Sequence, residues 1–103
     1  MTPFGRYTAP IAQGAPGATE LVVAPGEGRR ILLTAYVVVS DTGGTVKFRS
    51  GASTDKTGAM TFLAGGGISN SDVVVAMDED EELFVVTATS PVNGHFEYEV
   101  VPA

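Results

Sequence analysis

The sequence contains no cysteine and no tryptophan, and it has one histidine among its 103 residues. Without cysteine, disulfides cannot hold the fold, and thiolate zinc and redox motifs are excluded. His95 is the one ordinary general base near neutral pH. No G-x-S-x-G motif surrounds a serine, and neither a nucleophile nor an orienting group for His95 can be identified. We therefore predict a protein that is not an enzyme, with no catalytic residue and no cofactor.

Basic residues are scarce, since six Lys and Arg against twelve Asp and Glu give a net charge of −6. A surface of this sign repels phosphate backbones and lacks the basic stripe of a nucleic-acid-binding domain. Long hydrophobic runs are also absent: none approaches the ~18 residues that span a bilayer, and the N-terminus has no signal-peptide pattern. We expect no nucleic acid or membrane partner, and synthesis in the cytoplasm of the cell that makes the protein.

The stretch "RSGASTDKTGAM", residues 49–60, has the outline of a phosphate-binding loop. A working loop places a glycine directly before the lysine and opens a helix. Here Asp55 precedes Lys56, and its carboxylate would face the phosphates. A short apolar run follows instead of a helix. We interpret this stretch as an exposed connection between two strands.

Short Val-, Ile-, Phe- and Thr-rich runs, separated by turn residues, predict an all-β protein. The expected fold is an antiparallel β-sandwich, jelly-roll-like or of a related Greek-key type, over residues 18–103. Its strands are expected at 18–24, 30–40, 45–50, 59–64, 72–77, 82–89 and 94–101. Residues 1–17 are rich in Gly, Ala and Pro with little periodicity, which predicts an irregular N-terminal arm.

Two of these strands alternate clearly between apolar and polar residues. The expected inward residues are Val46, Phe48, Phe96, Tyr98 and Val100. Lys47 and Arg49 face solvent on one strand, and His95, Glu97 and Glu99 do so on the other. If the two strands were neighbours, these opposite charges would pair across the sheet.

The strands at 30–40 and 82–89 are instead apolar on both faces. A sandwich needs only one buried face per sheet, and large exposed apolar patches mark interfaces. We therefore expect a homo-oligomer, with a trimer favoured.

The run "MDEDEE", residues 77–82, invites a calcium interpretation through Asp78, Asp80 and Glu82. An EF-hand needs Gly and Glu at its sixth and twelfth positions, where this chain has Leu83 and Thr89. We predict no metal site and interpret the run as a charged turn that discourages edge pairing. An irregular cation site at residues 78–82 stays open.

Four segments together resemble the small all-β virion proteins of tailed bacteriophages, of the head decoration or cement type. In order they are "GEGRRILLTAYVVVS", "GGTVKFRSG", "TGAMTFLAGGGI" and "GHFEYEVV", within residues 26–101. The segment "SDVVVAMDEDEE" departs from the group in being more acidic. The resemblance implies a protein that binds the outer surface of the phage head and stabilises it by bridging subunits of the major capsid protein. The negative charge agrees with a position away from the packed DNA.

The expected arm carries four residues that could anchor it to a capsid: Phe4, Arg6, Tyr7 and Ile11. Arginine and tyrosine are favoured anchors at interfaces, and a segment of this composition has little reason to order itself alone. An alternative function is a receptor- or glycan-binding module of a phage head or tail fibre. That function would require an exposed aromatic platform or a cation site.

Overall fold

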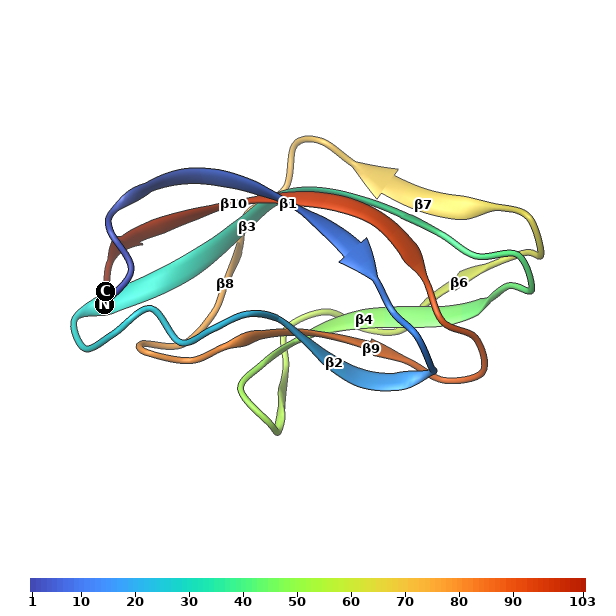
Figure 1. The fold of residues 1–103 in the computed structure, drawn as a ribbon, viewed down its shortest axis with the longest axis horizontal. Coiled ribbons are helices and arrows are strands. Elements are labelled where there is room, and N and C mark those ends of the chain that lie inside the picture. The colour runs from blue at the N-terminus through green and yellow to red at the C-terminus, as the bar shows by residue number, and fades with distance from the viewer.

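The computed structural model describes residues 1–103 and contains ten β-strands and no helix, so none that could cross a membrane. The strands are β1 (Gly5–Ala12), β2 (Gly17–Val22), β3 (Arg29–Val39), β4 (Gly44–Ser50), β5 (Thr54–Asp55), β6 (Met60–Phe62), β7 (Gly67–Asn70), β8 (Val75–Ala76), β9 (Leu83–Thr87) and β10 (Asn93–Pro102). They form two antiparallel sheets that lie face to face (Figure 1). The prediction of an antiparallel β-sandwich is confirmed.

The strand pairing follows a jelly-roll plan. Sheet A has the order β1-β10-β3-β7, with β8 also paired to β3; sheet B has the order β2-β9-β4-β5, with β6 also paired to β4. We count β5 with β6, and β7 with β8, as interrupted strands. The first strand then pairs with the last, the second with the second-last, and so on inward. A long hairpin that rolls up into two sheets gives this pattern.

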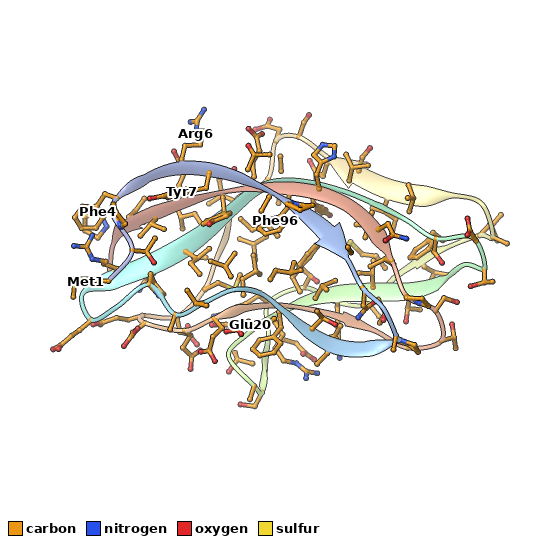
Figure 2. All side chains as sticks on the ribbon, in the orientation of Figure 1. Met1, Phe4, Arg6, Tyr7, Glu20 and Phe96 are labelled. Carbon is orange, nitrogen blue, oxygen red and sulfur yellow. The ribbon has the colours of Figure 1, made fainter.

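The core lies between the sheets, and its side chains alternate along the strands. Val46 and Phe48 of β4 are fully buried, as are Phe96 and Val100 of β10, which confirms the predicted alternation. Tyr36 of β3 stacks on Phe48 with 4.9 Å between ring centroids, so an aromatic pair joins the two sheets. Figure 2 shows Phe96 in the space between the sheets.

An extra residue in β3 changes which of its side chains face the core. The buried residues of this strand are Ile31, Leu33, Tyr36 and Val38, so the alternation shifts by one residue midway. Glu97 of β10 lies opposite Ala35, and the next residue of β10 lies opposite Leu33, which leaves Thr34 unmatched. Such a β-bulge bends the strand and re-aims its side chains. As a result Val37 and Val39 point away from the core.

The N-terminal segment forms a strand, so the prediction of an irregular arm over residues 1–17 is wrong. β1 pairs with β10 along its whole length at the edge of sheet A. Tyr7, Ala9 and Ile11 are its less exposed residues, an alternation that the Gly, Ala and Pro content obscures. Pro10 is tolerated because an edge strand has one side without hydrogen-bond partners.

The other strand predictions are confirmed in position but differ in extent. The expected strand at 59–64 shortens to β6, and the one at 72–77 contains only the two residues of β8. β7 lies in the stretch "AGGGISNS", between the expected strands at 59–64 and 72–77. Gly67 begins β7 so close to β3 that a Cβ there would overlap the carbonyl oxygen of Val38. The turn before β7 forms at Ala64 and Gly65, and it is closed by a hydrogen bond from the Gly66 N–H to the Leu63 carbonyl at 2.9 Å.

Gln13 ties the corner where the chain passes from sheet A to sheet B. Its Nε2 donates to the Gly17 carbonyl at 2.9 Å and to Thr19 Oγ1 at 3.1 Å. Its Oε1 accepts from Thr87 Oγ1 at 2.8 Å and from the Val92 N–H at 3.2 Å. Every polar atom of this buried side chain thus has a partner, which is the condition for burying it at little cost.

Candidate functional site

Two of the four predicted contact residues, Phe4 and Arg6, lie on the surface. Phe4 is 52% exposed, and its ring lies 3.9 Å from the guanidinium carbon of Arg29. Arg6 points away from the sandwich, and its Nη2 lies 3.3 Å from Glu99 Oε1 (Figure 2). Their contact with a capsid stays a prediction.

The other two, Tyr7 and Ile11, pack within the fold. Tyr7 stacks on Tyr98 with 5.2 Å between ring centroids, and its hydroxyl donates to the Pro3 carbonyl at 2.8 Å. Burial, with Tyr7 nearby, raises the pKa of Tyr98 above its ordinary value. Ile11 is 2% exposed and belongs to the core. The four residues therefore do not form one contact surface, and Ile11 is not accessible to a partner in this fold.

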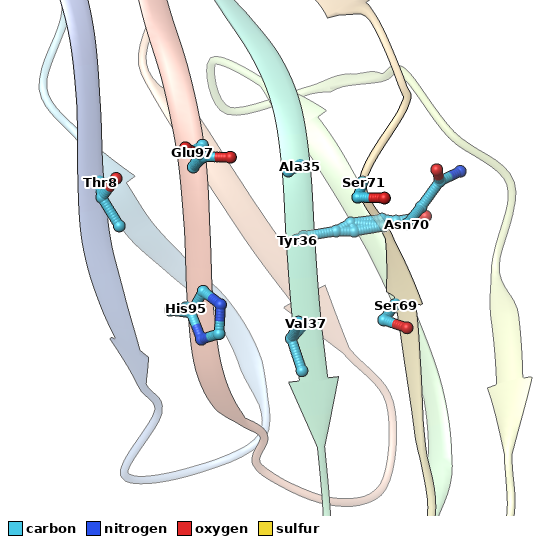
Figure 3. A pocket seen from close by; sticks show the side chains of 9 residues that line it. All are labelled: Thr8, Ala35, Tyr36, Val37, Ser69, Asn70, Ser71, His95 and Glu97. Atoms are coloured by element: carbon cyan, nitrogen blue, oxygen red, sulfur yellow. The ribbon is translucent and has the colours of Figure 1, made fainter.

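The outer face of sheet A is hollowed by a groove, which we call the sheet A groove. Its main part has a volume of about 600 Å³, and Thr8, His95, Glu97, Ala35, Val37 and Ser69 are among its lining residues (Figure 3). A second hollow of about 240 Å³ adjoins it and extends it toward Arg6 and Val74. The two hollows share Ser71 and Glu97.

The floor and walls of the groove come from different parts of the chain. The middle strands β10 and β3 form the floor, and β1 borders one side through Arg6 and Thr8. β7 and the connection from Ser71 to Val74 border the other side. In Figure 1 this connection rises above the plane of sheet A. The sequence predicts Glu97 on a polar face but gives no sign of the walls, because they depend on the path between β7 and β8.

Glu97 is the carboxylate at the centre of the groove, and none of the four ion pairs of the protein involves it. Its neighbour along the strand, Glu99, is paired with Arg6. His95 is exposed on the same face of β10, as predicted. The groove thus contains one half-buried carboxylate that lacks a cation of its own.

The outer face of sheet B has a different composition. Phe84 and Val86 of the middle strand β9 alternate with buried residues and are half-buried on this face. β4 places Arg49 beside Phe84 and Lys47 beside Val86. On the other side, β2 places Glu20 beside Phe84. An apolar strip therefore lies between charged residues of opposite sign.

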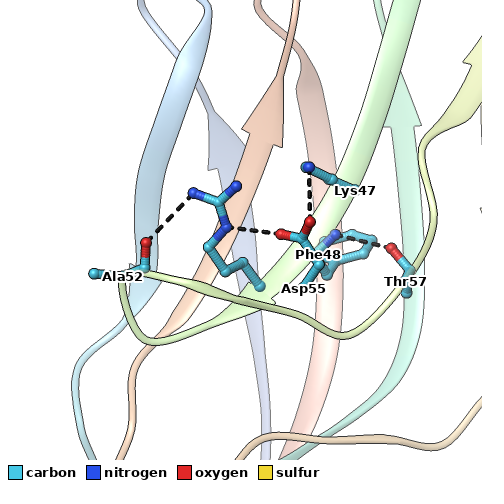
Figure 4. A network of polar contacts seen from close by, with 6 residues as sticks. Lys47, Phe48, Ala52, Asp55 and Thr57 are labelled. Carbon is cyan, nitrogen blue, oxygen red and sulfur yellow. Dashed lines mark hydrogen bonds and ion pairs between the residues drawn. The ribbon is translucent and has the colours of Figure 1, made fainter.

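Asp55 forms ion pairs with both basic residues of this face, Lys47 and Arg49 (Figure 4). Its Oδ2 lies 2.8 Å from Lys47 Nζ, and its Oδ1 lies 2.8 Å from Arg49 Nε. Hydrogen bonds from Lys47 and then Arg49 hold the pKa of Asp55 below its ordinary value. We call these three residues the Asp55 clamp.

The clamp bears on two expectations from the sequence. The conditional pairing of Lys47 and Arg49 with Glu97 and Glu99 does not occur, because β4 and β10 belong to different sheets. The stretch at 49–60 is a connection between strands, as predicted, and contains β5. Asp55 there turns back onto β4 rather than toward a phosphate.

The acidic run at 77–82 forms a turn whose side chains accept hydrogen bonds from neighbouring segments. Asp80 Oδ1 accepts from the Gly26 N–H at 2.9 Å, and Glu79 Oε2 accepts from the Gly28 N–H at 2.8 Å. Asp78 pairs with Lys56 at 2.8 Å. No group of three or more His, Asp or Glu residues has the geometry to hold a metal ion. The run therefore anchors the loop between β2 and β3.

Exposed large apolar side chains gather at the two ends of the molecule, which measures 40 × 25 × 21 Å. Met1 and Phe4 lie at the end that holds both termini, where Met1 contacts Gly26 (Figure 2). Val23 begins the connection from β2 to β3, which turns at the same end (Figure 1). Leu63, in the turn between β6 and β7, and Val39, at the end of β3, lie at the opposite end (Figure 1). We call these the terminal patch and the distal patch.

A scan of protein-family models, a search of curated proteins and a search of solved structures each gave no significant match to this chain.

Proposed function

We propose that the protein is a phage head decoration protein, which binds the outer surface of the capsid and stabilises it by bridging subunits of the major capsid protein. The observation that carries the proposal is the placement of the terminal and distal patches at opposite ends of a body 40 Å long. Leu63 is 83% exposed and Val23 is 62% exposed, although neither serves the core. A rigid body with an apolar contact at each end is suited to joining two neighbouring chains.

The resemblance to phage virion proteins supports the proposal through the positions of its motifs. The quoted segments fall on β3, β4, β6 and β10, which are strands of the sandwich. The jelly roll is a common fold of viral capsid proteins but also of lectins, so the fold alone does not decide the function. The net charge of −6 favours the outer surface of a DNA-filled head.

The proposed assembly is a homotrimer bound to the capsid. Each copy would present both patches, and a trimer would therefore contact several capsid subunits at once. Multivalent contact converts weak individual binding into strong retention. The half-buried Phe84 and Val86 on sheet B offer further apolar area for contact between copies.

The alternative, a glycan- or receptor-binding module, is less well supported by the aromatic residues. Tyr36 is 7% exposed, and its hydroxyl donates to Met60 Sδ at 3.4 Å inside the fold. Tyr98 is stacked between Tyr7 and Phe96. Neither ring offers an open face on which a sugar could stack.

The test is to mix the purified protein with expanded, undecorated capsids and to image them by electron microscopy. We expect ordered density on the outer surface. Variants Leu63→Ser and Val23→Ser, one in each patch, are each expected to weaken retention about tenfold. Ala52→Ser is the control, because Ala52 is exposed, lies in neither patch and does not line the sheet A groove.

Size-exclusion chromatography with light scattering gives the oligomeric state of each variant separately. Wild-type protein that leaves the capsids bare would overturn the proposal. Equal retention of Val23→Ser, Leu63→Ser and Ala52→Ser would support decoration without a contribution from the two patches. Density at the tail or on fibres would favour the alternative function.

A further inference from the structure

The sheet A groove contains a carboxylate, that of Glu97, which forms no ion pair within the protein. Glu97 lines both hollows, is half-buried, and has no cationic partner within the chain. Two other carboxylates on the sheets are paired, Glu99 with Arg6 and Asp55 with Lys47 and Arg49. Glu20 on the outer face of sheet B is unpaired, but it is exposed and lines neither hollow. A carboxylate held in a concave site, where water is partly displaced, binds cations more strongly than one on a flat surface.

The shape of the groove indicates an extended ligand. From the level of His95 to the level of Arg6, which pairs with Glu99, the groove follows β10 for four residue steps, or about 14 Å of strand. A peptide of about four residues in extended conformation has this length. The borders supply hydroxyl groups from Thr8, Ser69 and Ser71, which can exchange hydrogen bonds with a peptide backbone.

The chemistry favours a peptide over a sugar. Ala35 and Val37 form an apolar floor. Tyr36, the one Phe, Tyr or Trp residue in the lining, is 7% exposed, and the exposed ring in the groove is the imidazole of His95. Sugar sites commonly stack a ring of the ligand on an exposed aromatic side chain. A small apolar floor beside the half-buried carboxylate of Glu97, with the exposed Asp72 on the border of the second hollow, suits arginine or lysine, whose aliphatic stem can be buried and whose charged head can pair.

We propose that the sheet A groove binds an extended protein segment that carries an arginine or lysine, whose cationic head pairs with Glu97. The proposal stands apart from the decoration function, because it concerns the isolated protein and names the partner only by its chemistry. A segment of a capsid subunit, or of any other partner with this composition, would satisfy it.

The experiment is an NMR titration of the ¹⁵N-labelled protein with the peptide acetyl-Ser-Arg-Ser-amide. The matched probe is the same peptide with citrulline, which keeps the shape of arginine and loses its charge. We expect the arginine peptide to shift the amides of Thr8, Ala35 and Glu97, and to bind about tenfold more tightly than the citrulline peptide.

The protein offers a matched pair of variants for this test. Glu97→Gln is expected to abolish the preference for arginine over citrulline. Glu20→Gln removes the same charge from an exposed residue on the outer face of sheet B, which has no ion pair and lines neither hollow, and it is expected to keep the preference. Thermal melts of both variants check that the fold is intact.

Three outcomes would overturn the proposal. They are the absence of groove shifts at millimolar peptide, equal affinity for the two peptides, and equal loss of the preference in Glu97→Gln and Glu20→Gln. A methyl glycoside that shifts the same amides more strongly than the peptide would assign the groove to a saccharide instead. Because no capsid is present, failure here leaves the decoration proposal untouched, and failure on capsids leaves this one untouched.

Discussion

The two outer faces of the sandwich differ in charge pairing and in shape. Each sheet has one face in the core and one outer face without a covering layer. On sheet B, the Asp55 clamp neutralises both basic residues and leaves the apolar strip of Phe84 and Val86 between charged neighbours. On sheet A, the connection from β7 to β8 forms one border of the groove, and the apolar residues Ala35 and Val37 form its floor. Glu97 in this groove forms no ion pair.

The difference shows how local chain path decides what a sheet face can bind. A flat face with its charges paired internally offers mainly apolar area, which suits contact with another folded chain. A walled face with an unpaired charge offers directional binding to a smaller group. Four predictions test the elements that produce this difference, beginning with the largest expected effect.

Removal of residues 1–12 is expected to have the largest effect, because it deletes one border of the groove and the edge strand of sheet A. The deletion exposes the edge of β10 that pairs with β1. It also removes Ile11, a core residue that is 2% exposed in the intact protein. We expect a loss of about 5 kcal/mol or more in the free energy of unfolding, comparable to the whole stability of a small domain. Circular dichroism during heating measures it.

The matched deletion removes only residues 1–4, which precede β1. It takes away the hydrogen bond from the Thr2 N–H to the Pro25 carbonyl and the contact of Phe4 with Arg29, but leaves β1 paired. We expect a much smaller shift. If the protein that lacks residues 1–12 melts at the temperature of the full chain, β1 is not a strand of the sandwich in solution, and the arm interpretation is restored.

Gly94→Ala tests the close packing beneath the groove. Gly94 has φ +151°, and a Cβ at this position would overlap the carbonyl oxygen of Val37 on the neighbouring strand. We expect a loss of about 3 kcal/mol, because both the backbone conformation and the contact between β10 and β3 are strained. For a domain of this size that corresponds to a fall of more than about 10 °C in Tm.

Gly58→Ala is the control for this substitution, because a Cβ at Gly58 would meet no heavy atom within 4 Å and the φ of this residue is ordinary. We expect its Tm to stay within a degree or two of wild type, or to rise slightly through the reduced freedom of the unfolded chain. Equal Tm values for the two variants would show that β10 can move away from β3 without cost.

Gln13→Leu tests the corner that joins the two sheets. The substitution leaves the Val92 N–H and the Thr87 hydroxyl without the acceptor Gln13 Oε1. Because buried polar groups without hydrogen-bond partners are costly, we expect the free energy of unfolding to fall by about 2–4 kcal/mol. Urea unfolding measures this change. Thr19→Val is the control, since Gln13 Nε2 keeps its bond to the Gly17 carbonyl. A loss as large in the control would mean that Thr19, and not Gln13, holds the corner.

Much of the fold follows from the sequence, and the parts that do not have physical causes. Alternation in β4 and β10 predicts their buried faces, because each residue type follows the two-residue period. β1 is not predicted from the sequence, because its small residues and proline do not alternate clearly between apolar and polar side chains, although Ile11 is part of the core. Its stability comes from pairing with β10, a strand at the other end of the chain.

The candidate site is less predictable than the fold. The bulge at Thr34 reverses the faces of half of β3 and is set by the register against β10, which no local pattern encodes. The sequence predicts that Glu97 faces solvent. It does not reveal that Arg6 forms an ion pair with Glu99 and not with Glu97, because the position of Arg6 depends on how β1 pairs with β10.

Asp55→Asn is expected to have the smallest effect, and its pH dependence identifies the cause. The pKa of Asp55 is lower in the folded protein than its ordinary value of 3.8, so the ionised form is favoured by folding. The stabilisation is therefore fully present above pH 3.8 and is lost as the pH falls through the lower folded pKa. Because the clamp is exposed, we expect only a small decrease in Tm at neutral pH, reduced further by salt.

Asp41→Asn is the matched control, since it removes the same charge from an exposed turn that forms no ion pair. Melting curves from neutral pH down to about pH 2 are expected to show Asp55→Asn below wild type at neutral pH and equal to it at the acid end. The Asp41→Asn variant is expected to follow wild type throughout. A difference for Asp55→Asn that persists unchanged at the acid end would mean that the carboxylate charge is not its source, and that the side chain shapes the β4–β5 turn by packing alone.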